Sequence, residues 1–439
     1  MRGRSLTFIE GEVNIPSTNC AGRNDWNRRD VLQSLVKASV ATVACGLPRA
    51  LPAETKGRAK RVVCIWLDGA MSQLESWDPK PGTEFGGPFQ AIPTSVPGLS
   101  ISELMPRMAQ QMHRFSIIRS MHTQYEDHSR GVIPIQQGDP KNRGVTYPLL
   151  GSAVVKLLGK EDSDLPPYIH IKPGSGGFMF QDAGFLGPKY GALALGDGKA
   201  PPNLVVPQDE FKARVDRRRQ MRDRLNSRFD QQRLTDSSAA YNQTYRVAEQ
   251  MARHAELFDP SRLRPDDVAR YGGSQLGRHL LQARQLIEAG VTFVKVTMFH
   301  WDTHGDNFNC HLDGVSQVDQ ALAALVDDLV VRGLYEETLV LILSEFGRTP
   351  KINARVGRDH WPECWSLGMG GGGVQSGGVI GKTNDLGTFN AHEEYDIGHV
   401  YHTVFRALGI DPLLEEYDNG GQPLPIANEK CGAITQLLA

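Results

Sequence analysis

The stretch Arg61-Val-Val-Cys-Ile-Trp-Leu67 decides the fold class of this sequence. It is an unbroken apolar run that ends at the turn residues Asp68-Gly69. Such a run is typical of a strand that is buried on both faces. Residues 291–299 and 338–343 have the same character, and amphipathic helical segments lie between the three runs. Strands and helices that alternate in this way form parallel sheets covered by helices. We therefore expect an α/β protein with a mainly parallel sheet flanked by helices on both faces.

The remaining segments supply further elements of such a fold. Apolar residues recur with helical spacing in four segments. Gly290 and Gly333 directly follow the segments that end at residues 289 and 332, as at helix ends. We expect these helices at residues 100–113, 274–289, 316–332 and 399–408, and a short strand at 115–118. Residues 208–270 are highly charged and helical in pattern. They predict a helical excursion from one domain that spans residues 58–439.

The composition limits the partners of the protein. Its 439 residues carry a formal net charge of −2, so no overall field attracts nucleic acid, and we expect no nucleic-acid partner. The hydrophobic share of 40% and the charged share of 22% are typical of globular proteins. The six cysteines match neither a zinc ribbon nor a CxxC redox pair. Cys64 lies within the first apolar run, and we expect a buried free thiol there.

Residues 1–53 have the features of an export leader. The segment Asn27-Arg28-Arg29-Asp30 contains a twin-arginine pattern, and a mildly apolar stretch at 31–47 follows it. That stretch is short and interrupted by Lys37, so it predicts no stable transmembrane span. We expect the twin-arginine export machinery to deliver the protein to the periplasm or the cell exterior. Lipid anchoring at Cys45 and an amphipathic helix on a cytoplasmic protein are the less favoured alternatives.

Side chains suited to metal binding follow the expected strands. In open α/β sheets, ligands bind beyond the carboxyl ends of the strands. The candidate metal ligands are Asp68, Asp302, His304, Glu345, Asp359 and His360. The candidate catalytic residues are Ser120, Thr123, His128 and Arg348. Imidazoles mixed with carboxylates favour one or two divalent ions, zinc or manganese before magnesium or calcium. Each residue alone has an ordinary explanation as a turn, cap or surface group, but their joint position at one end of a sheet favours a site.

Four motifs extend this interpretation. They are Asp-Pro-Lys-Pro at 78–81, Trp-Asp-Thr-His at 301–304, Glu-Phe-Gly-Arg-Thr-Pro at 345–350 and Gly-Arg-Asp-His-Trp-Pro at 357–362. With them, the chain from about Arg28 to its end resembles the bacterial family called domain of unknown function 1501. That family is similar in fold to alkaline phosphatases, sulfatases and cofactor-independent phosphoglycerate mutases. The resemblance therefore implies an alkaline-phosphatase-like domain, but no particular reaction, since the substrates of the family are not generally established.

The superfamily pattern implies roles for the residues after the first two strands. Asp68 matches the aspartate that ends the first strand. Ser120 or Thr123 matches the nucleophile that follows the second strand, and both alternatives remain open.

The same pattern covers the later strands. Asp302 with His304 matches an Asp–His pair, although the spacing is closer than usual, so His300 or Asp306 could substitute. His360 matches the last histidine of the pattern. Phe346 follows Glu345 where the pattern has a histidine. Either His128 or Asp359 could supply the missing ligand, or one metal suffices.

These roles imply a metal-dependent hydrolase of phosphate or sulfate esters. One ion, at Asp302, His304 and His360, would polarise an ester oxygen. A second ion, at Asp68 and Glu345, would lower the pKa of a hydroxyl group or of water. The implied substrate is an anionic ester, for example on a sulfated or phosphorylated glycan.

An arginine would hold the anionic group of such a substrate. Arg348 or Arg130 could do so with the forked guanidinium geometry. The rival interpretation is a scaffold that has lost its catalytic centre and binds a glycan or a partner protein. Phe346 favours this rival.

Overall fold

The computed structural model describes residues 59–159, 164–200, 212–230 and 236–439. The predicted leader, residues 1–53, lies outside the described residues. Two parts of the predicted helical excursion, residues 208–211 and 231–235, lie outside them as well.

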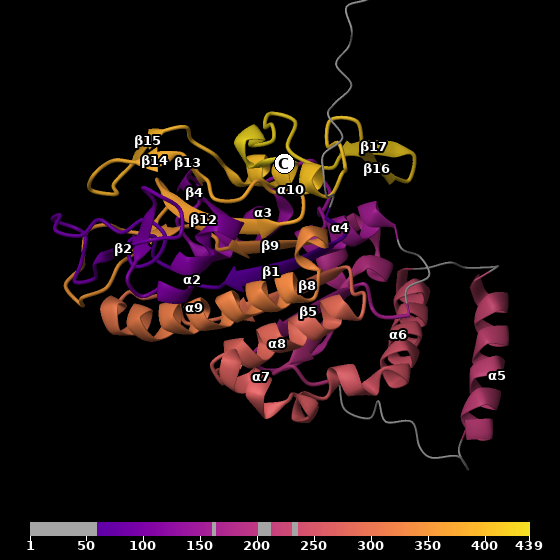
Figure 1. The fold of residues 1–439 in the computed structure, drawn as a ribbon. Helices are drawn as coiled ribbons and strands as arrows, with labels where there is room; N and C mark the ends of the chain where they lie inside the picture. Colours follow the sequence, from indigo (N-terminus) through magenta and orange to yellow (C-terminus); the bar gives the residue numbers. More distant parts are fainter. Residues whose placement is uncertain (1–58, 160–163, 201–211, 231–235) are drawn as a thin grey trace, which may run out of the picture. The chain divides into compact units, whose positions relative to one another are not determined.

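A nine-stranded sheet forms the centre of the fold (Figure 1). Its strand order is β13-β4-β12-β9-β1-β8-β5-β7-β6. β12 and β6 run antiparallel to the strands that they pair with, and the other pairings are parallel. The strands are β1 (Arg61–Leu67), β4 (Phe115–Met121), β5 (Tyr168–Lys172), β6 (Gly177–Met179), β7 (Ala192–Gly196), β8 (Phe293–Met298), β9 (Thr338–Leu343), β12 (Trp365–Gly371) and β13 (Val379–Ile380).

Helices cover both faces of this sheet (Figure 1). Alternate side chains of β1 enter two separate cores, with Val63 and Ile65 in one and Val62 and Trp66 in the other. The first core is completed by α2 (Pro106–Gln111), α8 (Gln275–Glu288) and α9 (Asn307–Val331). The second is completed by α3 (His128–Gln137), α4 (Leu150–Leu158) and α10 (Ile397–Ala407). The expected mainly parallel sheet with helices on both faces is confirmed.

Two of the expected helices have different starts in the structure. The helix expected at 100–113 begins only at Pro106, because Ser100–Ser102 forms β3 and pairs with β2 (Ala91–Pro93). The helix expected at 316–332 begins nine residues earlier, at Asn307. Gly314 weakens a helical prediction there. A Cβ at Gly314 would lie 2.9 Å from the Trp301 ring, so this glycine permits close packing of α9 against Trp301.

Other elements lie at the periphery of the sheet. The helices α5 (Lys212–Asp230), α6 (Asp236–Arg253) and α7 (Pro265–Arg270) lie in sequence between β7 and α8. Short strand pairs join β10 (Gly347–Arg348) to β11 (His360–Trp361), β14 (Lys382–Thr383) to β15 (Asn390–His392), and β16 (Glu416–Asn419) to β17 (Gln422–Pro425). Across the described residues, no helix has an apolar stretch long enough to cross a membrane.

One edge of the sheet collects the residues that follow the parallel strands. The carboxyl ends of β1, β4, β8 and β9 meet at this edge, because the four strands share one direction. The segments that follow them carry Asp68, His128, Asp302 and Glu345. The β10–β11 pair sets Arg348 opposite His360, and so returns the later loop to the same edge.

Candidate metal centre

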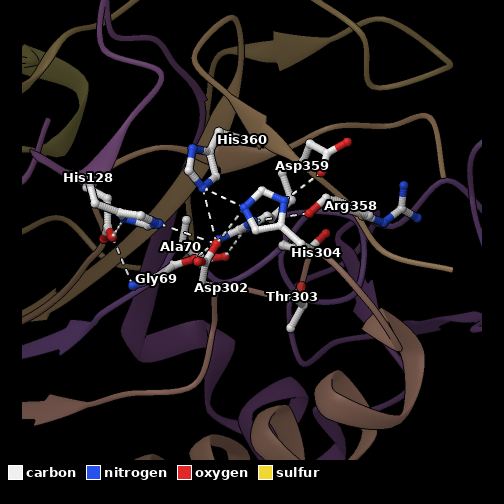
Figure 2. Close-up of polar contacts among 12 residues, drawn as sticks. Gly69, Ala70, His128, Asp302, Thr303, His304, Arg358, Asp359 and His360 are labelled. Carbon is white, nitrogen blue, oxygen red and sulfur yellow. Dashed lines mark hydrogen bonds and ion pairs between the residues drawn. The ribbon is translucent and has the colours of Figure 1, made fainter. Parts of the chain in front are cut away.

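The carboxylate of Asp302 is the centre of the polar cluster at this edge. Its Oδ1 atom lies 3.0 Å from Nε2 of His304, 3.1 Å from Nε2 of His360 and 3.3 Å from Nε2 of His128. Figure 2 shows the three imidazole rings directed toward Asp302 from three separate segments of the chain. Ligands bound at ~2.1 Å around one tetrahedral ion are roughly 3.4 Å apart. The ligand atoms of His128, Asp302 and His360 all lie within 4.8 Å of one another, close to the spacing of ligands that share an ion. His304 lies beside Asp302 and His360 and joins this group from one side.

The second nitrogen of each ring is already engaged. Nδ1 of His128 lies 2.7 Å from Oε1 of Glu345, and Nδ1 of His304 lies 2.6 Å from Oδ1 of Asp359. Nδ1 of His360 lies 2.6 Å from the main-chain oxygen of Glu126. All three partners are acceptors, so each Nδ1 carries a hydrogen and donates it. Metal-ligating histidines have this arrangement, since the outer hydrogen bond fixes the tautomer and the orientation of the ring.

This tautomer leaves the Nε2 lone pairs directed at one another. Nε2 of His304 and Nε2 of His360 are 3.0 Å apart. Nε2 of His128 is buried and makes no hydrogen bond with any described residue. Lone pairs and a carboxylate oxygen that converge in this way repel one another unless a cation lies among them. The donor set of three imidazoles and one carboxylate fits a divalent ion such as zinc.

The burial of the cluster changes the pKa values of its members. Burial alone would raise the pKa of Asp302, but the hydrogen bond and charge of Arg348 hold it well below its usual range. The hydrogen bond to Glu345 raises the pKa of His128. Burial lowers the pKa of His360, which favours the neutral ring that can bind a metal.

The guanidinium group of Arg348 fixes Asp302 in place. It is fully buried, and its Nη2 donates to Oδ1 of Asp302 at 2.6 Å. The same Nη2 also donates to the main-chain oxygen of Gly69, while Nε donates to that of Ala70 and Nη1 to that of Arg358. With its donors used in this way, Arg348 positions the carboxylate, and the structure does not present it to an anionic substrate.

Glu345 and Asp359 lie behind the histidines. Glu345 is fully buried and accepts hydrogen bonds from His128 and from the Gly69 amide at 2.8 Å. Asp359 accepts from His304 and, at 3.0 Å, from the side chain of Asn353. The hydrogen bond from His304 lowers the pKa of Asp359. Both carboxylates thus contact the outer nitrogens of histidines, and the metal-ligand role predicted for them from the sequence stays a prediction.

The sequence matches one protein family over almost all of its described part. The family described as protein of unknown function (DUF1501) matches residues 59–438. The chain belongs to this family. No curated protein matches the sequence.

Solved structures similar to this DUF1501 chain share little sequence with it. A sulfatase from Pseudoalteromonas sp. is 14% identical, with a TM-score of 0.37, over 88% of this chain and 72% of its own. The lipoteichoic acid synthase from Listeria monocytogenes is 8% identical, with a TM-score of 0.39, over 86% of this chain and 77% of its own. An alkaline phosphatase from the Antarctic bacterium TAB5 is 10% identical, with a TM-score of 0.36, over 81% of this chain and 99% of its own.

The two hydroxyl residues are placed apart from the histidines. Ser120 is fully buried, and its Oγ has no hydrogen-bond partner among the described residues. A Cβ at Gly381 would lie 1.7 Å from that oxygen, so the main chain covers it. Thr123 Oγ1 accepts the Tyr125 amide at 3.3 Å, as in a local turn. Neither hydroxyl has a described contact with the histidines or with Asp302.

Asp68 and Phe346 lie at the border of the cluster. Oδ1 of Asp68 accepts the Trp66 indole hydrogen at 2.7 Å. Burial and the nearby charge of Glu345 raise the pKa of Asp68. The ring of Phe346 stacks 4.6 Å from His360 and 4.9 Å from His128. Phe346 thus supports two rings, and His128, from a different segment, supplies the additional imidazole.

The sequence analysis missed two groups that orient the cluster. Asn353 holds Asp359 and also accepts the main-chain amides of Arg355 and Gly357 through its side-chain oxygen. Asparagine favours turns in which its side chain accepts a main-chain amide two residues further on, so this residue could have been found. The main-chain oxygen of Glu126 has no such signal, because any residue supplies a carbonyl group.

A second cluster of possible ligands caps a helix. Asp396 precedes α10 and accepts the His399 amide at 3.3 Å, and the thiol of Cys431 donates to Asp396 at 3.3 Å. Burial raises the pKa of Cys431 to about 12, so the thiol is protonated and can donate this hydrogen bond. Helix capping accounts for this group.

Proposed function

We propose that the protein is an exported hydrolase of phosphate or sulfate esters that uses one divalent ion. His128, Asp302, His304 and His360 would hold this ion. The observation that supports the proposal is the convergence of three Nε2 atoms on Oδ1 of Asp302, with every Nδ1 donating outward. The export step rests on the twin-arginine pattern of the sequence.

The donor set decides which metals to test first. Three imidazole nitrogens and a carboxylate suit zinc or manganese better than magnesium or calcium, which prefer oxygen ligands. Such an ion supplies Lewis acidity to an ester oxygen and positive charge for the anionic group.

The residues of the chain prepare this site in two further ways. Arg348 and Glu345 keep Asp302 and His128 in place, so little reorganisation accompanies substrate binding. The positive end of α3 also lies at the cluster, because His128 is the first residue of that ten-residue helix. An anionic ester group gains from that helix end, and the exposed Arg130 lies in the same turn.

The placement of Ser120 and Thr123 makes water the attacking group in this proposal. Water adds to the phosphorus or sulfur atom, the bond to the leaving oxygen breaks, and that oxygen takes a proton as it departs as an alcohol. The buried Ser120 and the stacked Phe346 also favour the second function, a catalytically reduced scaffold that binds a glycan or a partner protein.

Substitution of a ligand distinguishes the two functions. The wild-type protein, reconstituted with zinc, manganese, magnesium or calcium, is assayed on aryl phosphomonoesters, phosphodiesters and sulfate esters. We expect turnover that His360→Ala abolishes, because the lost ligand weakens the hold on the ion. His113→Ala is the matched control, since His113 is exposed and bonds only Ser95 among the described residues. Activity that survives His360→Ala would place the site elsewhere, and a complete lack of activity would favour the scaffold.

A further inference from the structure

A groove runs alongside the metal cluster between α8, α9 and the end of β8. Its deeper part has a volume of about 230 Å³ and is lined by Gln275, His279, Met298, Trp301 and Gln317, among others. A more open part of about 410 Å³ adjoins it, and the two parts share Asp313 and Gln317. Small-molecule sites in proteins span ~300–1,000 Å³, so the groove is large enough for a ligand.

His279 provides a polar side chain in the deeper part of the groove. Its side chain is 3% exposed and lines the deeper part. No hydrogen bond links its ring to any of the residues that the structure describes. Burial lowers its pKa to about 4, so at neutral pH the ring is uncharged, with one donor and one acceptor nitrogen. The ring can therefore both donate to and accept from a ligand in the groove.

The other polar groups of the groove are mostly uncharged. The side-chain amide of Gln317 donates to Oδ2 of Asp313 at 2.9 Å. This contact leaves Oδ1 of Asp313 and Oε1 of Gln317 without a hydrogen bond from a described residue. Asn309 and Gln320 add further amide groups in the open part. No lysine or arginine occurs among the described residues that line either part.

This set of groups selects the chemistry of the ligand. A phosphate or sulfate group only accepts hydrogen bonds at neutral pH, and it would meet the carboxylate of Asp313 with no cation nearby. A hydroxyl group both donates and accepts, and therefore matches carboxylate, amide and neutral imidazole side chains together. Met298 and Leu276 supply apolar surface for the carbon atoms of such a ligand.

The groove and the metal cluster share one wall. Trp301 lines the groove, and the next residue, Asp302, bears the carboxylate at the centre of the cluster. Consecutive Cα atoms are ~3.8 Å apart, so adjacent residues of the chain border the groove and the cluster. His300, on the same wall, has a positive φ of 84°, which turns the chain between β8 and the cluster.

We propose that this groove is a binding site for uncharged glycosyl units and that the substrate is a glycan whose ester group lies at the metal cluster. The second half of this statement rests on the proposed hydrolase function, whereas the binding of uncharged sugar does not. The groove holds neutral sugar residues next to the esterified one. It thereby selects an ester on an otherwise neutral glycan over a densely charged polyanion.

The test measures binding without catalysis. Metal-depleted full-length protein is titrated with uncharged oligosaccharides of glucose, galactose, mannose and xylose, and binding is followed by saturation-transfer NMR. We expect at least one series to bind. Gln317→Ala and Asp313→Ala should each weaken that binding about tenfold, the effect of losing ~1.4 kcal/mol of hydrogen bonding. Gln220→Ala, at an exposed glutamine on α5, is the matched control and should leave binding unchanged.

The outcomes separate this inference from the proposed function. Binding of no neutral oligosaccharide, or binding that survives both groove substitutions, overturns the inference even if aryl esters are hydrolysed. Binding of only sulfated oligosaccharides or of peptides overturns it too. Loss of neutral binding in both variants, with melting temperatures unchanged, supports the inference even if no ester is hydrolysed. Asp313 is exposed and Gln317 half-buried, so both variants should fold.

Discussion

Asp359→Ala distinguishes a residue that orients a ligand from a ligand itself. Asp359 holds Nδ1 of His304 at 2.6 Å, and its loss frees that ring to rotate or to place its hydrogen on Nε2. Removal of such an outer partner costs ~10–100-fold in metal affinity. That loss corresponds to about 1.4–2.7 kcal/mol. The side chain is 49% exposed, so the free energy of unfolding should change by no more than about 0.5 kcal/mol.

The assay is a competition for zinc against a chromophoric chelator at neutral pH, with thermal melting of the metal-free protein recorded in parallel. We expect Asp359→Ala to bind zinc more weakly than the wild type and more tightly than His360→Ala. Asp385→Ala, at an exposed aspartate with no hydrogen bond to a described residue, is the control. An affinity equal to that of the wild type would refute the orienting role. A loss as large as that of His360→Ala would instead make Asp359 a direct ligand.

Metal retention, turnover and export each provide a further test. Metal retention should fall on acidification, because the pKa of His128 is raised. The ring therefore gains a second proton, and loses the lone pair that would bind the metal, above the ordinary histidine pKa of ~6.5. Dialysis of the metal-loaded protein at stepwise lower pH measures this loss. Ser120→Ala should leave turnover unchanged, since its Oγ is buried under the main chain, and a large loss of kcat would restore it as a nucleophile. Replacement of Arg28 and Arg29 by lysine should keep the protein in the cytoplasm, and unchanged export on cell fractionation would contradict the twin-arginine interpretation.

The elements that the sequence predicted best are those buried on both faces. β1 and β9 have the predicted bounds, because an unbroken apolar run has no other stable place in a folded chain. The prediction of a helix at 100–113 was wrong for the first part of that range, because the helix begins only at Pro106. Ser100–Ser102 is too short for its own pattern to show, and its strand conformation depends on pairing with Ala91–Pro93.

Sequence order indicated which residues reach the sheet edge, but it could not assign their roles. Asp302, His304 and His360 were predicted as ligands, and the structure brings their side chains together. His128 was predicted as catalytic, and its Nε2 lies with theirs. Whether a carboxylate contacts an ion or the far nitrogen of a histidine depends on ångström-scale side-chain directions. The hydrogen bonds that join Glu345 to His128 and Asp359 to His304 bear on this question, and only the folded chain shows them.

The central claim is that one divalent ion lies among four side chains. Crystals of the purified protein, measured at the zinc and manganese absorption edges, test it most directly through anomalous difference maps. We predict a single strong peak at ~2.0–2.2 Å from Nε2 of His128, His304 and His360 and from Oδ1 of Asp302. A map without a peak among these atoms, from protein shown by elemental analysis to carry metal, would contradict the claim.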